Sequence, residues 1–211
     1  MHPYLTEFLS LAALHLLAVI SPGPDFAMTV RQSVSYGRAT GLVTALGIGA
    51  GISVHIAYTL LGVGFVLQRS PTLFLIAQLA GCAYLVWLAI QMLRARPASD
   101  FSTGQSERQT PSRGKAFATG FLTNATNPKA TLFFLSLFTL VVSSSTPVLI
   151  QLGYGLWMCL ATAAWFMLVA SLFSGERVRR RFLRLGHWFE RGMGVLVLAL
   201  AARLLYGLLT A

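Results

Sequence analysis

The stretch Ser21-Pro22-Gly23-Pro24-Asp25 interrupts an apolar run that extends from Leu5 to Val30. Its two prolines remove backbone donors and the glycine between them relaxes the turn, so no continuous helix passes through it undisturbed. A second interruption, Asn124-Ala125-Thr126-Asn127-Pro128-Lys129, lies inside the apolar run from Ala116 to Val142. Each interruption predicts the end of one helix and the start of another, with Ser21 or Asn127 as the cap and a proline near the first helical position.

The composition is that of a protein surrounded by lipid. Only 10% of the 211 residues are charged, against about 25% in a typical soluble domain, while 55% are hydrophobic and the mean hydropathy is +0.69. Such a chain cannot cover a water-facing surface. The sequence predicts an all-α polytopic membrane protein with six transmembrane helices, the first and fourth of them broken. The expected spans are Leu5–Val30, Gly41–Leu67, Pro71–Leu93, Ala116–Val142, Pro147–Phe173 and His187–Leu209.

Arginine and lysine are concentrated in alternate loops between the apolar runs. Arg31 and Arg38 follow the first run, Arg69 stands alone after the second, and the loop after the fourth run has no basic residue. By the positive-inside rule the basic loops face the cytoplasm, which places both termini outside the bacterial inner membrane. This topology, and not nucleic-acid binding, explains the net charge of +10. The other two basic loops hold Arg94, Arg96, Arg108, Arg113 and Lys115, and Arg177, Arg179, Arg180, Arg181 and Arg184.

The two halves of the chain have matching residues at a constant sequence offset. Pro128 lies 106 positions after Pro22 (128 minus 22), and the same offset carries Gly47 and Gly49 onto Gly153 and Gly155. The predicted organisation is a three-helix repeat over residues 1–93, a cytoplasmic loop over 94–115 and a second three-helix repeat over 116–211, within one membrane domain. Because each half has three helices, the second enters the membrane from the opposite side, which is the inverted repeat of many secondary transporters.

Broken helices point to a binding site. Lipid cannot satisfy the backbone groups that a break exposes, so breaks persist where protein or a watery cavity covers them. New helix starts suit a substrate carboxylate, and freed carbonyls suit an ammonium group. A zwitterionic amino acid needs both. The candidate substrate-binding residues are Ser21, Pro22, Gly23, Pro24, Asp25, Asn124, Asn127, Pro128 and Lys129.

Two charges lie next to the breaks, and each costs roughly 2.5–3.5 kcal/mol at the bilayer centre. One interpretation is an ion pair between Lys129 and Asp25 that holds the halves together. The other is substrate binding, with Lys129 on the carboxylate and Asp25 on the amino group or a coupling proton. Both can hold if the pair opens on binding, and Asp25 also fits a simple helix start near the headgroups. His15 and His55 are the other proton-coupling candidates, and each equally suits a hydrogen bond between helices. No further intramembrane acid is expected, which disfavours a cationic substrate.

Other functions fit less well. A serine hydrolase needs a G-x-S-x-G elbow and a metalloprotease needs H-E-x-x-H, and neither motif occurs, so no enzyme, cofactor or metal site is expected. A metal exporter needs several converging acids or histidines, and Lys129 would repel its cation. A membrane scaffold leaves the paired breaks unexplained. The spacing of Gly47 and Gly51, on a face with other small residues, predicts close helix packing.

Three segments resemble a known family. HLLAVISPGPDF, residues 15–26, and GFLTNATNPKA, residues 120–130, are similar to the first-helix and fourth-helix signatures of the lysine exporter superfamily, homoserine/threonine resistance branch. GCAYLVWL, residues 81–88, followed by Met92-Leu93-Arg94, is similar to the third-helix ending. The resemblance implies proton-coupled export of small neutral amino acids of the threonine and homoserine class from the bacterial cytoplasm. It leaves leucine, cysteine or basic amino acids, a metal cation, and a homo-oligomeric assembly as open alternatives.

Overall fold

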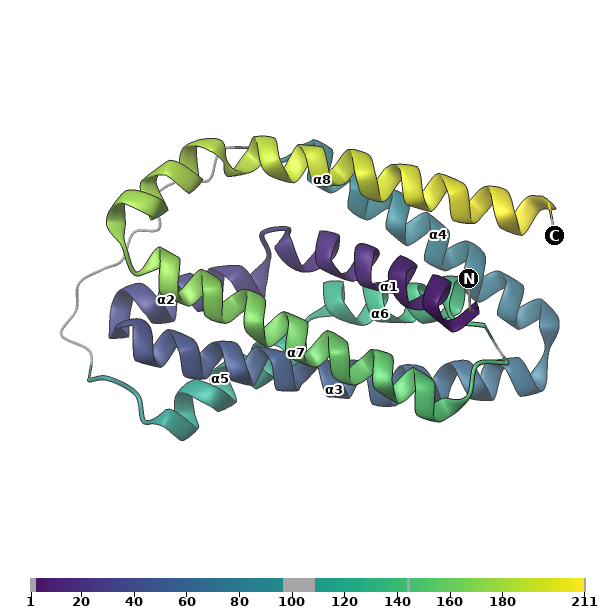
Figure 1. Cartoon of the computed structure of the whole chain (residues 1–211), viewed down its shortest axis with the longest axis horizontal. Coiled ribbons are helices and arrows are strands. Elements are labelled where there is room, and N and C mark those ends of the chain that lie inside the picture. Colours follow the sequence, from purple (N-terminus) through teal and green to yellow (C-terminus); the bar gives the residue numbers. More distant parts are fainter. Residues whose placement is uncertain (1–2, 97–108, 144, 211) are drawn as a thin grey trace.

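The computed structural model describes residues 3–96, 109–143 and 145–210, and within them the regular structure is entirely helical. Eight helices in these ranges lie roughly along one long axis (Figure 1). They are α1 Pro3–Ile20, α2 Pro24–Tyr36, α3 Arg38–Arg69, α4 Pro71–Leu93, α5 Arg113–Ala125, α6 Pro128–Val141, α7 Val148–Phe173 and α8 Glu176–Thr210.

The helices break at the two interruptions that the sequence indicates. α1 ends at Ile20 and α2 begins at Pro24, with a bend of 53° between them, while α5 ends at Ala125 and α6 begins at Pro128. Both prolines stand at the start of the new helix, where a missing N–H costs nothing. The positions of Pro24 and Pro128 therefore confirm that the prolines mark the starts of new helices.

The prediction of the caps is right for α6 and wrong for α2. The side chain of Asn127 caps α6 by accepting a hydrogen bond from the backbone N–H of Lys129 at 3.0 Å. Gly23 is the N-cap of α2 and makes no side-chain cap bond, so Ser21 is not the cap. The chain needs two residues after Ser21 to complete the turn, which leaves the Ser21 hydroxyl available for contacts with other helices.

Among the described residues, four helices are long and apolar enough to cross a membrane, and the bent pair α1–α2 makes a fifth span if it is taken as one. The four are α4, α7, residues Arg38–Gly62 of α3 and residues Gly186–Thr210 of α8. The stretch expected to form the fourth span is divided into α5 and α6, of 13 and 14 residues. A helix needs about 20 residues to cross the hydrocarbon, so neither crosses alone.

α3 packs against α5 on one side and α7 on another, and glycines allow the close approach. A Cβ atom on Gly47 would collide with the carbonyl oxygen of Phe117 in α5, and one on Gly120 of α5 would collide with the carbonyl oxygen of Thr44 in α3. A Cβ on Gly51 would lie 2.9 Å from Cβ of Asn124. These contacts confirm the packing predicted from the glycine spacing, and they place the end of α5 against α3.

Apart from the two breaks, the described connections between helices lie at the two ends of the molecule (Figure 1). The start of α1 and the end of α8 lie at one end, together with the α3–α4 and α6–α7 connections. The α2–α3 and α7–α8 connections and the start of α5 lie at the other end. α5 begins at Arg113, inside the loop expected over residues 94–115. Residues 97–108 of that loop lie outside the described ranges.

Candidate substrate site

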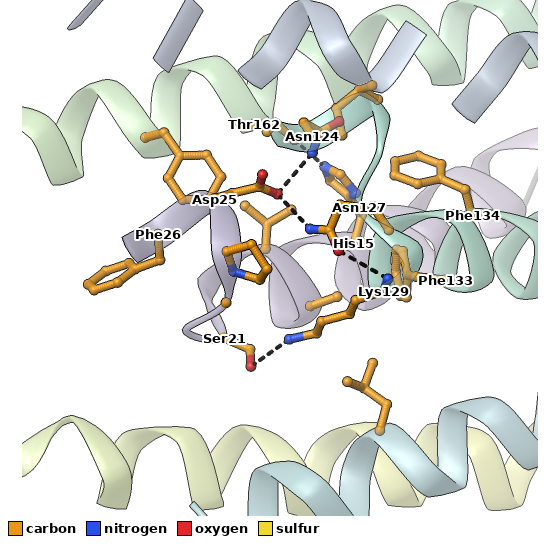
Figure 2. Close-up of a pocket in the computed structure, with 18 residues that line it drawn as sticks. His15, Ser21, Asp25, Phe26, Asn124, Asn127, Lys129, Phe133, Phe134 and Thr162 are labelled. Carbon is orange, nitrogen blue, oxygen red and sulfur yellow. Dashed lines mark hydrogen bonds between the residues drawn. The ribbon is translucent and has the colours of Figure 1, made fainter. Parts of the chain in front are cut away.

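A cavity of about 50 Å³ lies between the two helix breaks (Figure 2). Helices α1, α2, α6 and α7 supply most of its wall, with single residues from α3, α4 and α5. Most of the predicted site residues line it: Ser21, Gly23, Pro24, Asp25, Asn124, Asn127 and Lys129, with His15. Pro22, Pro128 and His55 are not among the lining residues.

One wall of the cavity is built around the carboxylate of Asp25. Its Oδ2 accepts hydrogen bonds from Nδ2 of Asn124 at 2.9 Å and from Nδ2 of Asn127 at 3.4 Å. Its Oδ1 is buried and has no partner among the described residues. Oδ1 of Asn124 is also without a partner there, but it faces Gly51 of α3, which does not line the cavity. The two asparagines stand at the α5–α6 break, so the two broken helices are joined here. An unpartnered carboxylate oxygen at the cavity wall suits a ligand that brings N–H donors.

The opposite wall carries the ammonium group of Lys129. Its Nζ donates to Oγ of Ser21 at 3.3 Å, and the Ser21 hydroxyl in turn donates to Oε1 of Glu190 at 3.2 Å. Nζ also lies over Gly23, 3.7 Å from where a Cβ atom would stand. The backbone carbonyl of Lys129 accepts a hydrogen bond from the Tyr84 hydroxyl at 2.8 Å. This wall therefore presents a cation and a hydroxyl beside the first turn of α2.

Asp25 and Lys129 are not paired with each other. Figure 2 shows the carboxylate and the ammonium group bonded to different partners and pointing apart. A direct ion pair between them was one of the two interpretations of the sequence, and this geometry does not contain it. The charges instead stand on separate walls of one cavity.

His15 is fully buried at the aromatic end of the cavity. Its Nε2 lies 3.0 Å from Oγ1 of Thr162, and its ring stands at 5.8 Å from the ring centres of Phe134 and Trp157 and at 6.4 Å from that of Phe133. Its Nδ1 is buried with no partner among the described residues. The histidine is thus fixed on one side and free to bond on the other.

His55 is buried behind the cavity and not in it. Its Nε2 lies 2.9 Å from the backbone carbonyl of Asn124, its Nδ1 lies 2.7 Å from the Tyr58 hydroxyl, and its ring stacks on Phe134 at 5.4 Å. A carbonyl only accepts, so Nε2 carries the proton and Nδ1 accepts from Tyr58. The same carbonyl also accepts a hydrogen bond from the backbone N–H of Asn127 at 2.8 Å, so His55 adds a second bond and ties the end of α5 to α3.

Sequence reasoning missed Glu190 and the wall around His15. Glu190 stands in α8, half-buried, with its carboxylate on the Ser21 hydroxyl. Its presence corrects the expectation that no further acid lies within the membrane. The sequence does hold a signal, because Glu190 is an acid inside the last apolar run. Its neighbour Arg191, however, makes the two look like a charged pair at the membrane interface. Thr162, Phe133 and Phe134 carry no sequence signal, because their role depends on how α6 and α7 pack against α1.

A zwitterion matches this arrangement. Acceptor oxygens stand on one wall, a cation and a hydroxyl on the other, and the starts of α2 and α6 add N–H groups that lack helical partners. An α-amino acid presents an ammonium and a carboxylate one carbon apart, so it can meet both walls at once. The remaining wall is apolar and aromatic, apart from His15 and Thr162, and is suited to the substrate's side chain.

Comparison with known proteins agrees with this chemistry. The family model described as LysE type translocator matches residues 16–208. The chain is 35% identical over 190 residues to the threonine efflux protein of Salmonella typhi, and 34% identical over 190 residues to that of Escherichia coli K12; each match covers 90% of this chain and 92% of the relative. It is 36% identical over 135 residues, 64% of each chain, to the homoserine/homoserine lactone efflux protein of Salmonella typhimurium. No solved structure matches significantly. This membrane protein belongs to the LysE type translocator family.

Proposed function

We propose that this chain exports small neutral amino acids of the threonine and homoserine class from the cytoplasm by proton antiport. The observation that carries the proposal is the cavity between the two helix breaks, with the Asp25 carboxylate on one wall and the Lys129 ammonium on the other. The carboxylate of Asp25, held by Asn124 and Asn127, binds the substrate ammonium. Lys129, Ser21 and the start of α2 bind its carboxylate.

Proton antiport follows from competition at Asp25. A substrate ammonium needs an ionised carboxylate, and a protonated Asp25 offers it one acceptor oxygen fewer and no charge. Substrate and proton therefore exclude each other at the same atom Oδ1, so the site carries one of them in each direction. His15 and His55 stay candidates for passing that proton, but their contacts with Thr162, Asn124 and Tyr58 suit binding and structural roles better.

Movement of the helices around the breaks provides access. A cavity of about 50 Å³ holds only a few water molecules, at roughly 10–15 Å³ of such volume for each. A whole amino acid needs more room, so the walls separate when it binds. Hydrogen bonds of Asp25 and Lys129 link the pairs α1–α2 and α5–α6 at this point, and bending at residues 21–23 and 126–127 opens the site toward either end.

The inverted repeat supports this alternating movement. Each half has a broken helix pair followed by two long helices: α1–α2, α3 and α4, then α5–α6, α7 and α8. A Cβ on Gly49 of α3 would lie 2.6 Å from Ala163 of α7, and one on Gly155 of α7 would lie 2.9 Å from Ile56 of α3. The two glycines that the sequence offset relates thus face the partner half. Residues 1–93 and 116–211 form the two repeats.

The basic connections belong on the cytoplasmic side of the inner membrane. The connections after α2 and α7 and the start of α5 lie at one end of the molecule (Figure 1), and Arg38, Arg113 and Lys115 lie in the described helices that begin there. The positive-inside rule directs that end to the cytoplasm and both termini outward. A substrate released at the end that holds the termini is exported.

An efflux panel tests the proposal. Cells that overproduce the chain are loaded with excess threonine, homoserine, leucine, cysteine or lysine, and intracellular accumulation and growth are compared with cells that carry an empty vector. We expect lower accumulation and better growth with threonine and homoserine. Unchanged accumulation across the panel contradicts export of these amino acids, and a change confined to leucine, cysteine or lysine favours one of the alternative substrates.

A further inference from the structure

The aromatic end of the cavity holds a polar pair that the binding of an α-amino and an α-carboxylate group does not use. His15 comes from α1 and Thr162 from α7, and both line the cavity. Each is buried, with 0% and 1% of the residue exposed. Around them the wall is apolar or aromatic, formed by Ile52, Phe133, Phe134 and Phe166. A polar pair in such a setting needs hydrogen-bond partners for all its groups.

The His15 ring uses only one of its two nitrogens. Nε2 is held by the Thr162 hydroxyl at 3.0 Å, and three aromatic rings at 5.8–6.4 Å fix the plane of the imidazole. Nδ1 has no partner among the described residues. A fully buried polar atom without a partner is costly, so a group that reaches it and bonds to it is favoured over one that cannot.

We propose that His15, oriented by Thr162, forms a hydrogen bond with a hydroxyl group on the substrate side chain and so selects hydroxylated amino acids over apolar ones of the same shape. The inference rests on the proposed function, since it assumes that the ammonium and carboxylate groups bind at Asp25 and Lys129. With those groups fixed, the side chain of the amino acid points to the remaining wall. A hydroxyl both donates and accepts, so it satisfies Nδ1 in either tautomer of the ring, whereas a methyl group satisfies neither.

The selectivity follows from whether the substrate side chain can form the hydrogen bond with Nδ1. Threonine and valine have the same shape and differ by a hydroxyl in place of a methyl. Valine leaves Nδ1 buried and unpaired, and sites that hydrogen-bond a hydroxyl reject analogues that lack it much more strongly than apolar pockets reject a change of size. A preference of about tenfold or more for threonine over valine is expected from one such bond. Serine and alanine form a second pair with the same difference.

The test is competition in proteoliposomes that contain the purified full chain. Labelled threonine is exchanged across the membrane, and unlabelled threonine, valine, serine and alanine compete with it. The quantity measured is the ratio of the inhibitory concentrations of valine and threonine. His15→Phe keeps an aromatic ring of similar size and removes both nitrogens. Thr162→Val keeps the shape of the residue and removes the hydroxyl that orients the ring.

The expected result is a ratio of about ten or more in the native protein that falls to about one in His15→Phe. In Thr162→Val we expect an intermediate ratio, because the ring stays and loses its fixed orientation. Thr44→Val is the matched control: Thr44 is buried in α3, its hydroxyl bonds to the carbonyl of Thr40 at 3.0 Å, and it does not line the cavity. Its ratio stays native.

The inference is overturned if His15→Phe keeps the native ratio, or if the native protein does not distinguish threonine from valine. If His15→Phe does not reach the membrane, Thr162→Val decides, and an unchanged ratio in that variant overturns the inference. A native protein that exchanges none of the four amino acids contradicts the proposed function itself. A native protein that exchanges threonine and valine equally well contradicts only the recognition of the substrate hydroxyl by His15.

Discussion

Neutralising Asp25 tests whether its carboxylate binds the ammonium group of the substrate. In Asp25→Asn the amide oxygen can keep the hydrogen bonds that Oδ2 accepts from Asn124 at 2.9 Å and Asn127 at 3.4 Å. The amide nitrogen then occupies the position of Oδ1, which has no partner in the native protein. The variant therefore presents N–H donors to a substrate ammonium that itself only donates. The substitution keeps the shape and the contacts between the broken helices and reverses the polarity of the site.

The expected loss is large because the lost bond is charged. A hydrogen bond to a charged group contributes about 1.5–3 kcal/mol, which corresponds to about 10- to 150-fold weaker binding. The variant also loses the atom at which substrate and proton compete, so a pH gradient no longer drives transport. The measurement is the apparent affinity for threonine in exchange across proteoliposomes, together with flux driven by an imposed pH gradient.

The control is the other carboxylate on the broken first helix. Glu7 is half-buried at the start of α1, accepts hydrogen bonds from Thr146 Oγ1 at 2.9 Å and from the backbone N–H of Ser143 at 3.1 Å, and does not line the cavity. Glu7→Gln should leave the affinity for threonine within about twofold of native. If Asp25→Asn also stays within twofold and still responds to the pH gradient, the assignment of the ammonium to Asp25 is wrong.

Three further changes have distinct expected outcomes. Lys129→Met should abolish efflux of amino acids while the protein still inserts in the membrane, as shown by cell fractionation; native efflux would remove Lys129 from the site. Glu190→Gln withdraws the acid that balances Lys129 through Ser21, so the apparent affinity for threonine in exchange should rise about two- to fivefold, and a fall would contradict this. Gly120→Ala forces a methyl group into the backbone of α3 and should destabilise the protein by about 1–3 kcal/mol in thermal unfolding in detergent. Gly153→Ala, with nothing within 4 Å of the added carbon, should not.

The sequence predicts the parts of this structure that depend on local chemistry. Pro24 and Pro128 mark the starts of new helices because a proline at the first helical position has no N–H to satisfy. Asn127 is identified as a cap for a similarly local reason. Ser21 is misjudged because its partners, Lys129 and Glu190, come from helices far along the chain, and no local pattern announces them.

Tertiary packing decides the rest of the site. His15 faces the cavity and His55 stands behind it, although both are single histidines in apolar helices. The difference arises from which face of α1 meets α7 and which face of α3 meets the end of α5. Gly51 allows Asn124 to approach α3, and that approach sets the position of the cavity wall around Asp25. Such contacts cannot be obtained from spacing within one helix.

The most direct test of the central claim is the coupled movement of threonine and protons through the purified protein. Proteoliposomes are loaded with labelled threonine, a pH gradient is imposed in each direction, and internal pH and retained threonine are followed together. We predict that threonine leaves fastest when the outside is acidic and that protons enter as it leaves. Threonine release that ignores the gradient, or protons that leave together with threonine, would contradict proton antiport; no release of threonine at any gradient would contradict export itself.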